Sequence, residues 1–253
     1  MYSKKDAVIY KNSALTYNKL NERANQLART LLNLGVKPNT PVGILADKSL
    51  EMIVGVLGIL KAGAAYLPVD PDYPSDRINF IIEESDCKVL LTHAKYMNLE
   101  INNVSKINID SNESYEKDGA NPENRNSSSD LAYFIYTSGT TGVPKGSMIR
   151  HFSVIRTVRN VNYMDMSSED RLLYTSAVVF DVTTYEIWGA LLNGMTLYVV
   201  DKETILDTEA LGRELLENKI TILHLTSALF TQIAEDRIDI FSGLTYLLIG
   251  GDV

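Results

Sequence analysis

Hydrophobic positions along the chain follow two spacings, one typical of helices and one typical of buried strands. From Tyr17 to Leu34 apolar residues recur at alternating steps of three and four, which predicts an amphipathic helix that ends at Gly35. A second helix is predicted over Leu50–Ala62, and it is apolar on nearly all sides, so it must be covered on both faces. Short apolar runs predict strands, of which the first two form a hairpin: Ala7–Tyr10, Leu15–Tyr17, Pro41–Ala46, Ala65–Val69 and Lys88–Thr92. Strands alternating with helices predict an α/β fold with mostly parallel sheets flanked by helices.

The same alternation resumes after a polar interval. Residues 111–130 are polar, turn-rich and aperiodic, which predicts a solvated connector between a first α/β lobe at 1–110 and a second at 131–253. In the second lobe a helix is predicted over Thr183–Leu192, and strands are predicted at Arg171–Ser176, Thr196–Val200, Ile220–Leu225 and Leu244–Gly250. Ligands of such folds usually bind beyond the carboxyl ends of strands, and the sequence stops directly after a strand. We therefore expect the second lobe to be incomplete at its C-terminal end.

Composition limits the kinds of binding partner and the cellular compartment that we expect for this protein. With 24 Lys and Arg against 32 Asp and Glu, the net charge of −8 argues against a nucleic-acid partner. The longest apolar stretch, Met52–Leu60, is too short to cross a bilayer, and no signal segment opens the chain, so we expect a cytoplasmic protein without a membrane partner. The single cysteine, Cys87, is interpreted as a buried inert thiol whose pKa the neighbouring Asp86 raises. His93, His151 and Cys87 lack metal-ligand spacing, so no metal site is predicted.

One stretch carries candidate chemistry. The apolar run Leu131–Tyr136 predicts a buried strand, and it leads directly into a loop rich in glycine and hydroxyl groups that Lys145 closes. Glycines let the backbone fold around a guest, and hydroxyl, backbone N–H and ammonium groups are the donors that a polyphosphate needs. A Ser/Thr/Gly-rich surface turn is the alternative. A Walker loop is excluded by spacing, because Pro144 stands five residues after Gly139 and Lys145 is followed by Gly146. The residues predicted to bind phosphate are Thr137, Ser138, Gly139, Thr140, Thr141, Gly142 and Lys145.

The segment from Tyr136 to Gly146, Tyr-Thr-Ser-Gly-Thr-Thr-Gly-Val-Pro-Lys-Gly, resembles the signature loop of the adenylate-forming superfamily, which includes acyl-CoA synthetases, luciferases and adenylation domains of nonribosomal peptide synthetases. Further stretches resemble the amino-acid-activating branch: Leu15–Leu20, Leu60–Asp70, Phe180–Gly194 and Gly250–Asp252. Two departures are visible, because Thr183 stands where this branch usually has serine and Asp252 replaces the usual glutamate of a Gly-Gly-Glu turn.

The resemblance implies a role for each matching residue. Lys145 and Thr137 would be catalytic, and Gly250, Gly251 and Asp252 would approach the adenine of ATP. Asp181 would hold the α-ammonium of an amino acid, and a carboxylate buried at a cleft edge would reject acids without an amine. An ordinary surface aspartate at a helix start is the alternative. The side-chain pocket would be formed by Val182, Tyr185, His224, Leu248 and Gly250, and it would suit a medium-to-large, partly polar side chain such as a phenolic one. Tyr185 is expected to share a helix face with Asp181, and His224 reads equally well as a core histidine.

The resemblance implies the N-terminal portion of an adenylation domain in antibiotic biosynthesis. Such a domain forms aminoacyl-AMP from an amino acid and Mg·ATP, and loads the acyl group on the phosphopantetheine thiol of a peptidyl carrier protein within a larger synthetase. The later family motifs, including the Mg-ligating glutamate and the C-terminal lysine, are absent from the sequence, so the resemblance implies little activity for this chain alone. An acid:CoA ligase and a non-catalytic scaffold are the alternatives. No motif favours a Ser-His-Asp arrangement.

Overall fold

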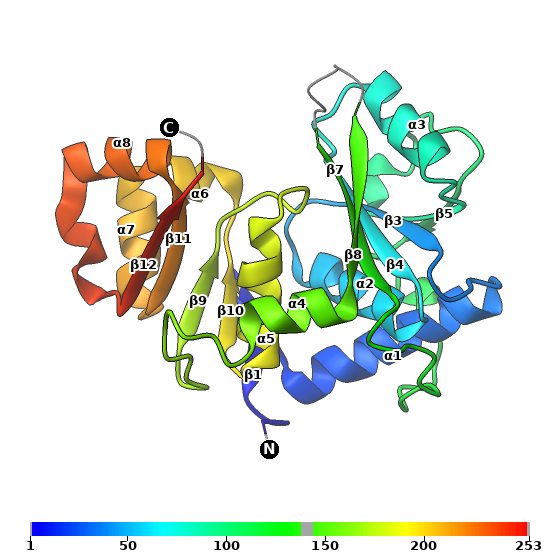
Figure 1. Ribbon diagram of the computed structural model, residues 1–253, viewed down its shortest axis with the longest axis horizontal. Helices are drawn as coiled ribbons and strands as arrows, with labels where there is room; N and C mark the ends of the chain where they lie inside the picture. Colours follow the sequence, from blue (N-terminus) through cyan, green and yellow to red (C-terminus); the bar gives the residue numbers. More distant parts are fainter. Residues whose placement is uncertain (1, 138–143, 252–253) are drawn as a thin grey trace. The chain divides into compact units, whose positions relative to one another are not determined.

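The computed structural model describes residues 2–137 and 144–251. Its contacts divide the chain into two compact units: unit 1 comprises residues 1–17, 156–177 and 182–253, and unit 2 comprises residues 18–155 and 178–181. Each unit is built on one sheet, and Figure 1 labels many of the strands and helices. The predicted α/β fold with mostly parallel sheets is therefore confirmed.

Unit 2 is built on a sheet in the order β6-β5-β3-β4-β7-β8. All neighbours run parallel except β7 and β8, which form an antiparallel pair (Figure 1, green). The strands are β3 (Pro41–Leu45), β4 (Ala65–Val69), β5 (Val89–Thr92), β6 (Ser105–Asn108), β7 (Leu131–Thr137) and β8 (Lys145–Arg150). The helices are α1 (Tyr17–Asn33), α2 (Leu50–Lys61), α3 (Ser75–Glu84) and the first five residues of α4 (His151–Val158), with short 3-10 turns η1 (Ala94–Tyr96) and η2 (Asn112–Ser114).

Two helices of unit 2 confirm the predicted hydrophobic patterns. The apolar stripe of α1 is buried at Leu20, Ala24, Leu27, Ala28 and Leu31. Helix α2 is buried on nearly all sides, as its composition requires, and it begins where the Ser49 side chain accepts a hydrogen bond from Met52 N. One side of the sheet packs against α3, and the core there comprises Leu45, Leu67, Val69, Ile78, Ile81, Ile82, Cys87 and Leu90.

Unit 1 is built on a sheet in the order β12-β11-β9-β10-β1-β2. The strands are β1 (Asp6–Tyr10), β2 (Ser13–Thr16), β9 (Arg171–Tyr174), β10 (Thr196–Val199), β11 (Ile222–Thr226) and β12 (Tyr246–Gly250). All pairs are parallel except the β1–β2 hairpin. Helical segments are η3 (Thr184–Trp188), α5 (Gly189–Leu192), α6 (Lys202–Leu206), α7 (Thr208–Glu217), α8 (Ser227–Arg237) and η4 (Ile238–Gly243). The segment η3 is a π-helix where the sequence predicts an ordinary helix.

The observed units differ from the predicted lobes in the placement of two segments, the N-terminal hairpin and strand β7. The N-terminal hairpin was expected in the first lobe, but β1 pairs with β10. Strand β7 was expected in the second lobe, but it pairs with β4 through Tyr133 and Tyr66. Pairing between strands far apart in sequence is decided by burial of both strands, which no local pattern reveals.

The polar interval 111–130 also differs from its prediction as a connector between lobes. It lies within unit 2 and is held against α1 by several hydrogen bonds. Asn25 Nδ2 donates to the Gly119 carbonyl at 2.8 Å, and the Arg29 guanidinium donates to the carbonyls of Asp118 and Ala120 at 3.1 and 3.0 Å. The polar residues of the interval are thus partners of a helix surface. Among the described residues no helix is long and apolar enough to cross a membrane.

Candidate functional site

Thr137 and Lys145 lie opposite each other where strands β7 and β8 meet. They are Cα partners of the antiparallel ladder, and both side chains are exposed. Next to them, Tyr136 pairs with Gly146, and a Cβ atom at Gly146 would lie 2.9 Å from Cζ of the tyrosine ring, so a larger residue there would require the ring to shift. The connecting residues Ser138, Gly139, Thr140, Thr141 and Gly142 lie outside the described residues. The structure therefore brings the two predicted catalytic residues together at the base of the predicted phosphate loop.

Asp181 is open to water in this structure. Its side chain is exposed, as is the preceding Phe180 ring, which is 60% exposed. Its expected role, holding the α-ammonium of an amino acid at a cleft edge, stays a prediction. Tyr185, by contrast, is only 8% exposed and lies in the π-helix, so the four-residue α-helical spacing that was to place both on one face does not apply.

Three of the predicted pocket residues share one face of the unit 1 sheet. His224 and Leu248 are Cα partners on the parallel strands β11 and β12, and Gly250 follows Leu248 by two positions. Partners across a ladder, and residues two apart along a strand, point to the same side of a sheet. A Cβ atom at Gly250 would lie 3.5 Å from His224 Nε2, so the glycine leaves open space beside the imidazole. The side chain of Val182 is half-buried, and Gly251 is exposed with a φ of 114°. Asp252 lies outside the described residues.

This face ends at the point in the unit 1 sheet where ligands of doubly wound folds usually bind. The chain leaves β9 for its neighbour β10 on one side, then crosses to β11 on the other side and continues outward to β12. The carboxyl ends of β9 and β11 therefore flank the topological switch point of the sheet. His224 is the middle residue of β11, two positions before its carboxyl end, and Figure 1 shows β11 and β12 (orange to red) side by side.

Tyr185 is buried in the same unit. Its hydroxyl lies 3.1 Å from the sulfur of Met164. Burial raises the pKa of the Tyr185 phenol, so this side chain is neutral at physiological pH. The phenol proton is directed at the thioether, so the Tyr185 oxygen keeps only acceptor capacity, and its role as a wall of the side-chain pocket stays a prediction.

Unit 2 has its own switch point, between β3 and β5, and the side chains that lie there were not predicted from the sequence. Ser49 Oγ is 3.2 Å from His93 Nε2, and His93 Nδ1 is 2.6 Å from Asp110 Oδ1. These residues follow the ends of β3, β5 and β6, which meet at one sheet edge. Ser49 is 7% exposed and its oxygen already accepts from Met52 N at 3.0 Å. The Ser-His-Asp geometry therefore serves as a buried helix cap, without room for a substrate at the hydroxyl.

Burial shifts the pKa values of two further titratable side chains of unit 2, Cys87 and His151. Burial raises the pKa of the Cys87 thiol to about 11, and the predicted cause, the neighbouring Asp86, contributes least. Cys87 is 1% exposed, so its predicted burial is confirmed, while its inertness stays a prediction. Burial lowers the pKa of His151, whose Nε2 has no hydrogen-bond partner. Among the described residues no group of three or more His, Cys, Asp or Glu side chains could hold a metal ion.

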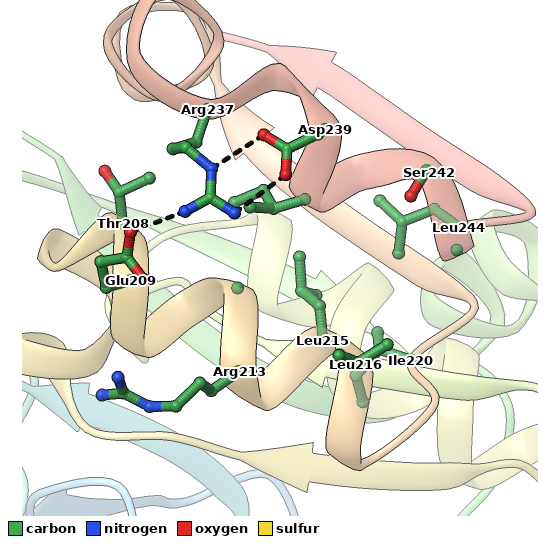
Figure 2. Close-up of a pocket in the computed structure, with 13 residues that line it drawn as sticks. Thr208, Glu209, Arg213, Leu215, Leu216, Ile220, Arg237, Asp239, Ser242 and Leu244 are labelled. Atoms are coloured by element: carbon green, nitrogen blue, oxygen red, sulfur yellow. Dashed lines mark hydrogen bonds and ion pairs between the residues drawn. The ribbon is translucent and has the colours of Figure 1, made fainter.

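A pocket of about 370 Å³ lies elsewhere in unit 1, between α7 and η4. Figure 2 shows Arg237 at one side of it, paired with Asp239 and Glu209. Its apolar lining comprises Leu215, Leu216, Ile220, Ile240 and Leu244, and none of the predicted site residues lines it. The charged side chains of Arg237, Asp239 and Glu209 pair with one another, and the pocket lies away from the switch point of the sheet. The pocket therefore does not define a catalytic site.

Known proteins resemble the chain along its whole length. A family model described as "AMP-binding enzyme" matches residues 1–253. The chain belongs to the AMP-binding enzyme family. Within it, the chain is 46% identical over 246 residues to gramicidin S synthase 2 of Brevibacillus brevis, covering 97% of this chain and 6% of that protein. It is 44% identical over 250 residues to surfactin synthase subunit 2 of Bacillus subtilis (strain 168), covering 97% of this chain and 7% of that protein.

Solved structures show the same fold. A nonribosomal peptide synthetase, FmoA3, in its α-methyl-L-serine-AMP bound form matches with 27% identity and a TM-score of 0.91, covering 98% of this chain and 28% of that one. The N-terminal subdomain of Klebsiella oxytoca NpsA in complex with 3-hydroxyanthranilyl-AMSN matches with 24% identity and a TM-score of 0.89, covering 99% of this chain and 63% of that one, and it supports the fold alone. The chain thus spans a small part of the peptide synthetases that it matches.

Proposed function

We propose that this AMP-binding chain is part of an adenylation domain that activates an amino acid. In the reaction, an amino-acid carboxylate attacks the α-phosphate of Mg·ATP to give aminoacyl-AMP and pyrophosphate. The acyl group then passes to the phosphopantetheine thiol of a peptidyl carrier protein in the same synthetase, as one step in making a peptide antibiotic. The observation that carries the proposal is the match to FmoA3, a synthetase solved with an aminoacyl-AMP, at a TM-score of 0.91.

The phosphate side of the reaction would fall to the β7–β8 hairpin. Thr137 offers a hydroxyl and Lys145 an ammonium group, and both are exposed at the base of the loop. At about 4 Å, one unit-charge pair contributes roughly 1 kcal/mol in bulk water and about 4 kcal/mol at an effective dielectric constant of 20. The benefit of Lys145 therefore grows as bound nucleotide displaces water. Magnesium would arrive as part of the Mg·ATP substrate, because this ion is usually held by few carboxylates together with substrate phosphates.

The amino-acid side would fall to Asp181 for the ammonium and to Val182, Tyr185, His224, Leu248 and Gly250 for the side chain. The shared face of His224, Leu248 and Gly250 supports this assignment, because the glycine leaves space beside an imidazole that can hydrogen-bond. Such a pocket suits a medium-to-large, partly polar side chain. The adenine would lie near Gly250, Gly251 and Asp252, directly beyond the strand end. An exposed carboxylate pairs with a cation for about 0.2–1 kcal/mol, so Asp181 would favour an amine by about fivefold at most unless it is covered on binding.

Calorimetric titration of the chain tests the proposal. The ligands are an aminoacyl-sulfamoyl adenosine, which imitates aminoacyl-AMP, and the same compound without its α-amine. We expect the amine-bearing compound to bind more tightly, and Asp181→Asn to remove the difference. Asp76→Asn serves as the matched control, since Asp76 is also an exposed aspartate of unit 2 at the start of a helix.

Two outcomes of the titration would contradict the proposal and separate its alternatives. Tighter binding of the compound without an amine would favour an acid:CoA ligase. Failure of a correctly folded chain to bind either compound, ATP or AMP would favour a non-catalytic scaffold.

A further inference from the structure

Glu186 is a completely buried carboxylate to which the proposed reaction assigns no role. Its side chain is 0% exposed, and it lies in the π-helix η3 directly after Tyr185. Burying a carboxylate costs several kcal/mol unless hydrogen bonds replace its hydration. A chain that keeps such a group in its interior must therefore use its oxygens for bonds that an apolar side chain could not make.

The oxygens of Glu186 bind the backbone where strand β9 ends. Oε1 accepts from Thr175 N at 2.9 Å, and both carboxylate oxygens lie 3.3 Å from Ser176 N. The Thr175 hydroxyl lies 2.9 Å from Oε1 and 2.9 Å from the carbonyl oxygen of His224, so its one proton is shared between these two acceptors. Strand β9 pairs with β10 only as far as Tyr174, so these N–H groups lie beyond the ladder. Buried N–H groups need acceptors, and the carboxylate supplies them in place of a neighbouring strand.

The same contact reaches β11 through Thr175. The ladder between β9 and β11 consists of one pair, Leu172 and Ile222, so the strands separate toward their carboxyl ends. Across this separation, Thr175 Oγ1 lies 2.9 Å from the carbonyl oxygen of His224. One side-chain network therefore links η3, β9 and β11 at the topological switch point of unit 1, and two of its neighbours are the predicted pocket residues Tyr185 and His224.

We propose that Glu186 is a positioning residue for the amino-acid pocket, holding Tyr185 through the π-helix and His224 through Thr175. This inference rests on the proposed function. Glu186 would act through the backbone and would not touch the substrate. A charged acceptor bonds N–H groups about twice as strongly as a neutral one, which explains a carboxylate at a position that packing alone would fill with an apolar side chain.

The test compares two ligands on the same folded chain, the aminoacyl-sulfamoyl adenosine and AMP. Because AMP lacks the aminoacyl part, the ratio of the two dissociation constants reports the pocket, whereas a loss of folded protein weakens both ligands equally. We expect Glu186→Met to reduce the preference for the aminoacyl ligand at least tenfold. Glu186→Gln keeps one acceptor oxygen and should reduce it severalfold. Glu203→Gln is the control, since Glu203 is exposed on α6 of the same unit.

Thr175→Val keeps the tests decisive if Glu186→Met does not fold. It retains the backbone bond to Glu186 and removes only the hydroxyl that bridges to His224, so it should also lower the preference severalfold. An unchanged ratio in folded Glu186→Met, or in Thr175→Val if the former does not fold, overturns the inference. Absence of aminoacyl-ligand binding by the unsubstituted chain would instead contradict the proposed function, so the two failures are distinguishable.

Discussion

Replacing Ser49 by alanine should destabilise α2 more than a cap substitution normally does, because one hydroxyl serves two buried partners. Loss of the bond to Met52 N, which is 3.0 Å long, removes an N-cap and costs about 1 kcal/mol. Loss of the contact to His93 Nε2 leaves a buried ring nitrogen without that partner, which costs a further 1–3 kcal/mol or so. The expected total is about 2–4 kcal/mol. This is a large share of the stability of a typical domain.

Hydrogen exchange followed by mass spectrometry measures this effect at the helix itself. A loss of 2–4 kcal/mol should make the amides of residues 50–61 exchange about 30-fold faster or more, since each 1.4 kcal/mol is a factor of ten. Exchange is preferable to a single unfolding midpoint, because a chain of two compact units need not unfold in one step. Fluorescence would also miss the effect, since the only tryptophan, Trp188, lies in unit 1.

Ser85→Ala is the matched control for this substitution. Ser85 lies in the same unit, and its hydroxyl donates to helix carbonyls of Ile81 and Ile82 at the end of α3. Those carbonyls also accept backbone bonds from Ser85 and Cys87, so the control should cost less than about 1 kcal/mol. If Ser49→Ala exchanges no faster at α2 than Ser85→Ala does at α3, the two-partner reasoning is refuted.

The remaining predictions concern single groups. Iodoacetamide should modify Cys87 of the folded chain very slowly at pH 7 and rapidly in urea, as followed by mass spectrometry, because burial raises the pKa of the thiol to about 11; fast modification of the folded chain would contradict this. Partial burial raises the pKa of Asp110, but the Ala94 N–H and the His93 ring lower it by more, so the pKa of this carboxyl lies below its usual value. The carboxylate therefore stabilises the folded state above its unfolded pKa of about 3.9, and this stabilisation is lost as the pH falls. The stability difference between the parent chain and Asp110→Asn in urea should therefore shrink between about pH 5 and pH 3, and a constant difference would contradict it. Gly250→Ala should fold normally, since its Cβ would lie 3.5 Å from His224 Nε2, and should weaken large aminoacyl ligands more than small ones in the calorimetric titration; equal weakening would argue against a pocket role.

Local hydrophobic patterns were sufficient to predict most elements of both sheets. The stripe of α1 and the all-round apolar surface of α2 each follow from residue spacing, and each is buried as expected. Strand pairing was not predictable in the same way. The partner of β1 is β10, roughly 190 residues away, and any buried parallel strand presents a similar apolar run. For this reason the predicted lobes and the observed units disagree.

Some site residues could likewise be selected from the sequence, and others could not. The family resemblance selected His224, Leu248 and Gly250, and the structure places these three residues on one face of a sheet. Ser49, His93 and Glu186 were missed because each looks ordinary in its local segment, as a helix cap, a strand end and a helix residue. The signal that could have found the first two is their position directly beyond predicted parallel strands, where chain segments distant in sequence converge. The buried state of Glu186 depends on a π-helix, and residue spacing gives no sign of one.

The two units differ in how the polar groups at the switch point of each sheet find hydrogen-bond partners. This difference bears on where a substrate would bind. Every switch point exposes strand ends whose polar groups need partners. In unit 2 those partners are internal, because Ser49, His93 and Asp110 bond one another and the first also caps a helix. In unit 1 the internal network of Glu186 and Thr175 satisfies the end of β9, while Gly250 on β12 leaves space beside the His224 ring. The first arrangement leaves a ligand few groups to bond, whereas the second leaves space beside an imidazole, which supports the proposal that the amino-acid side chain is selected in unit 1.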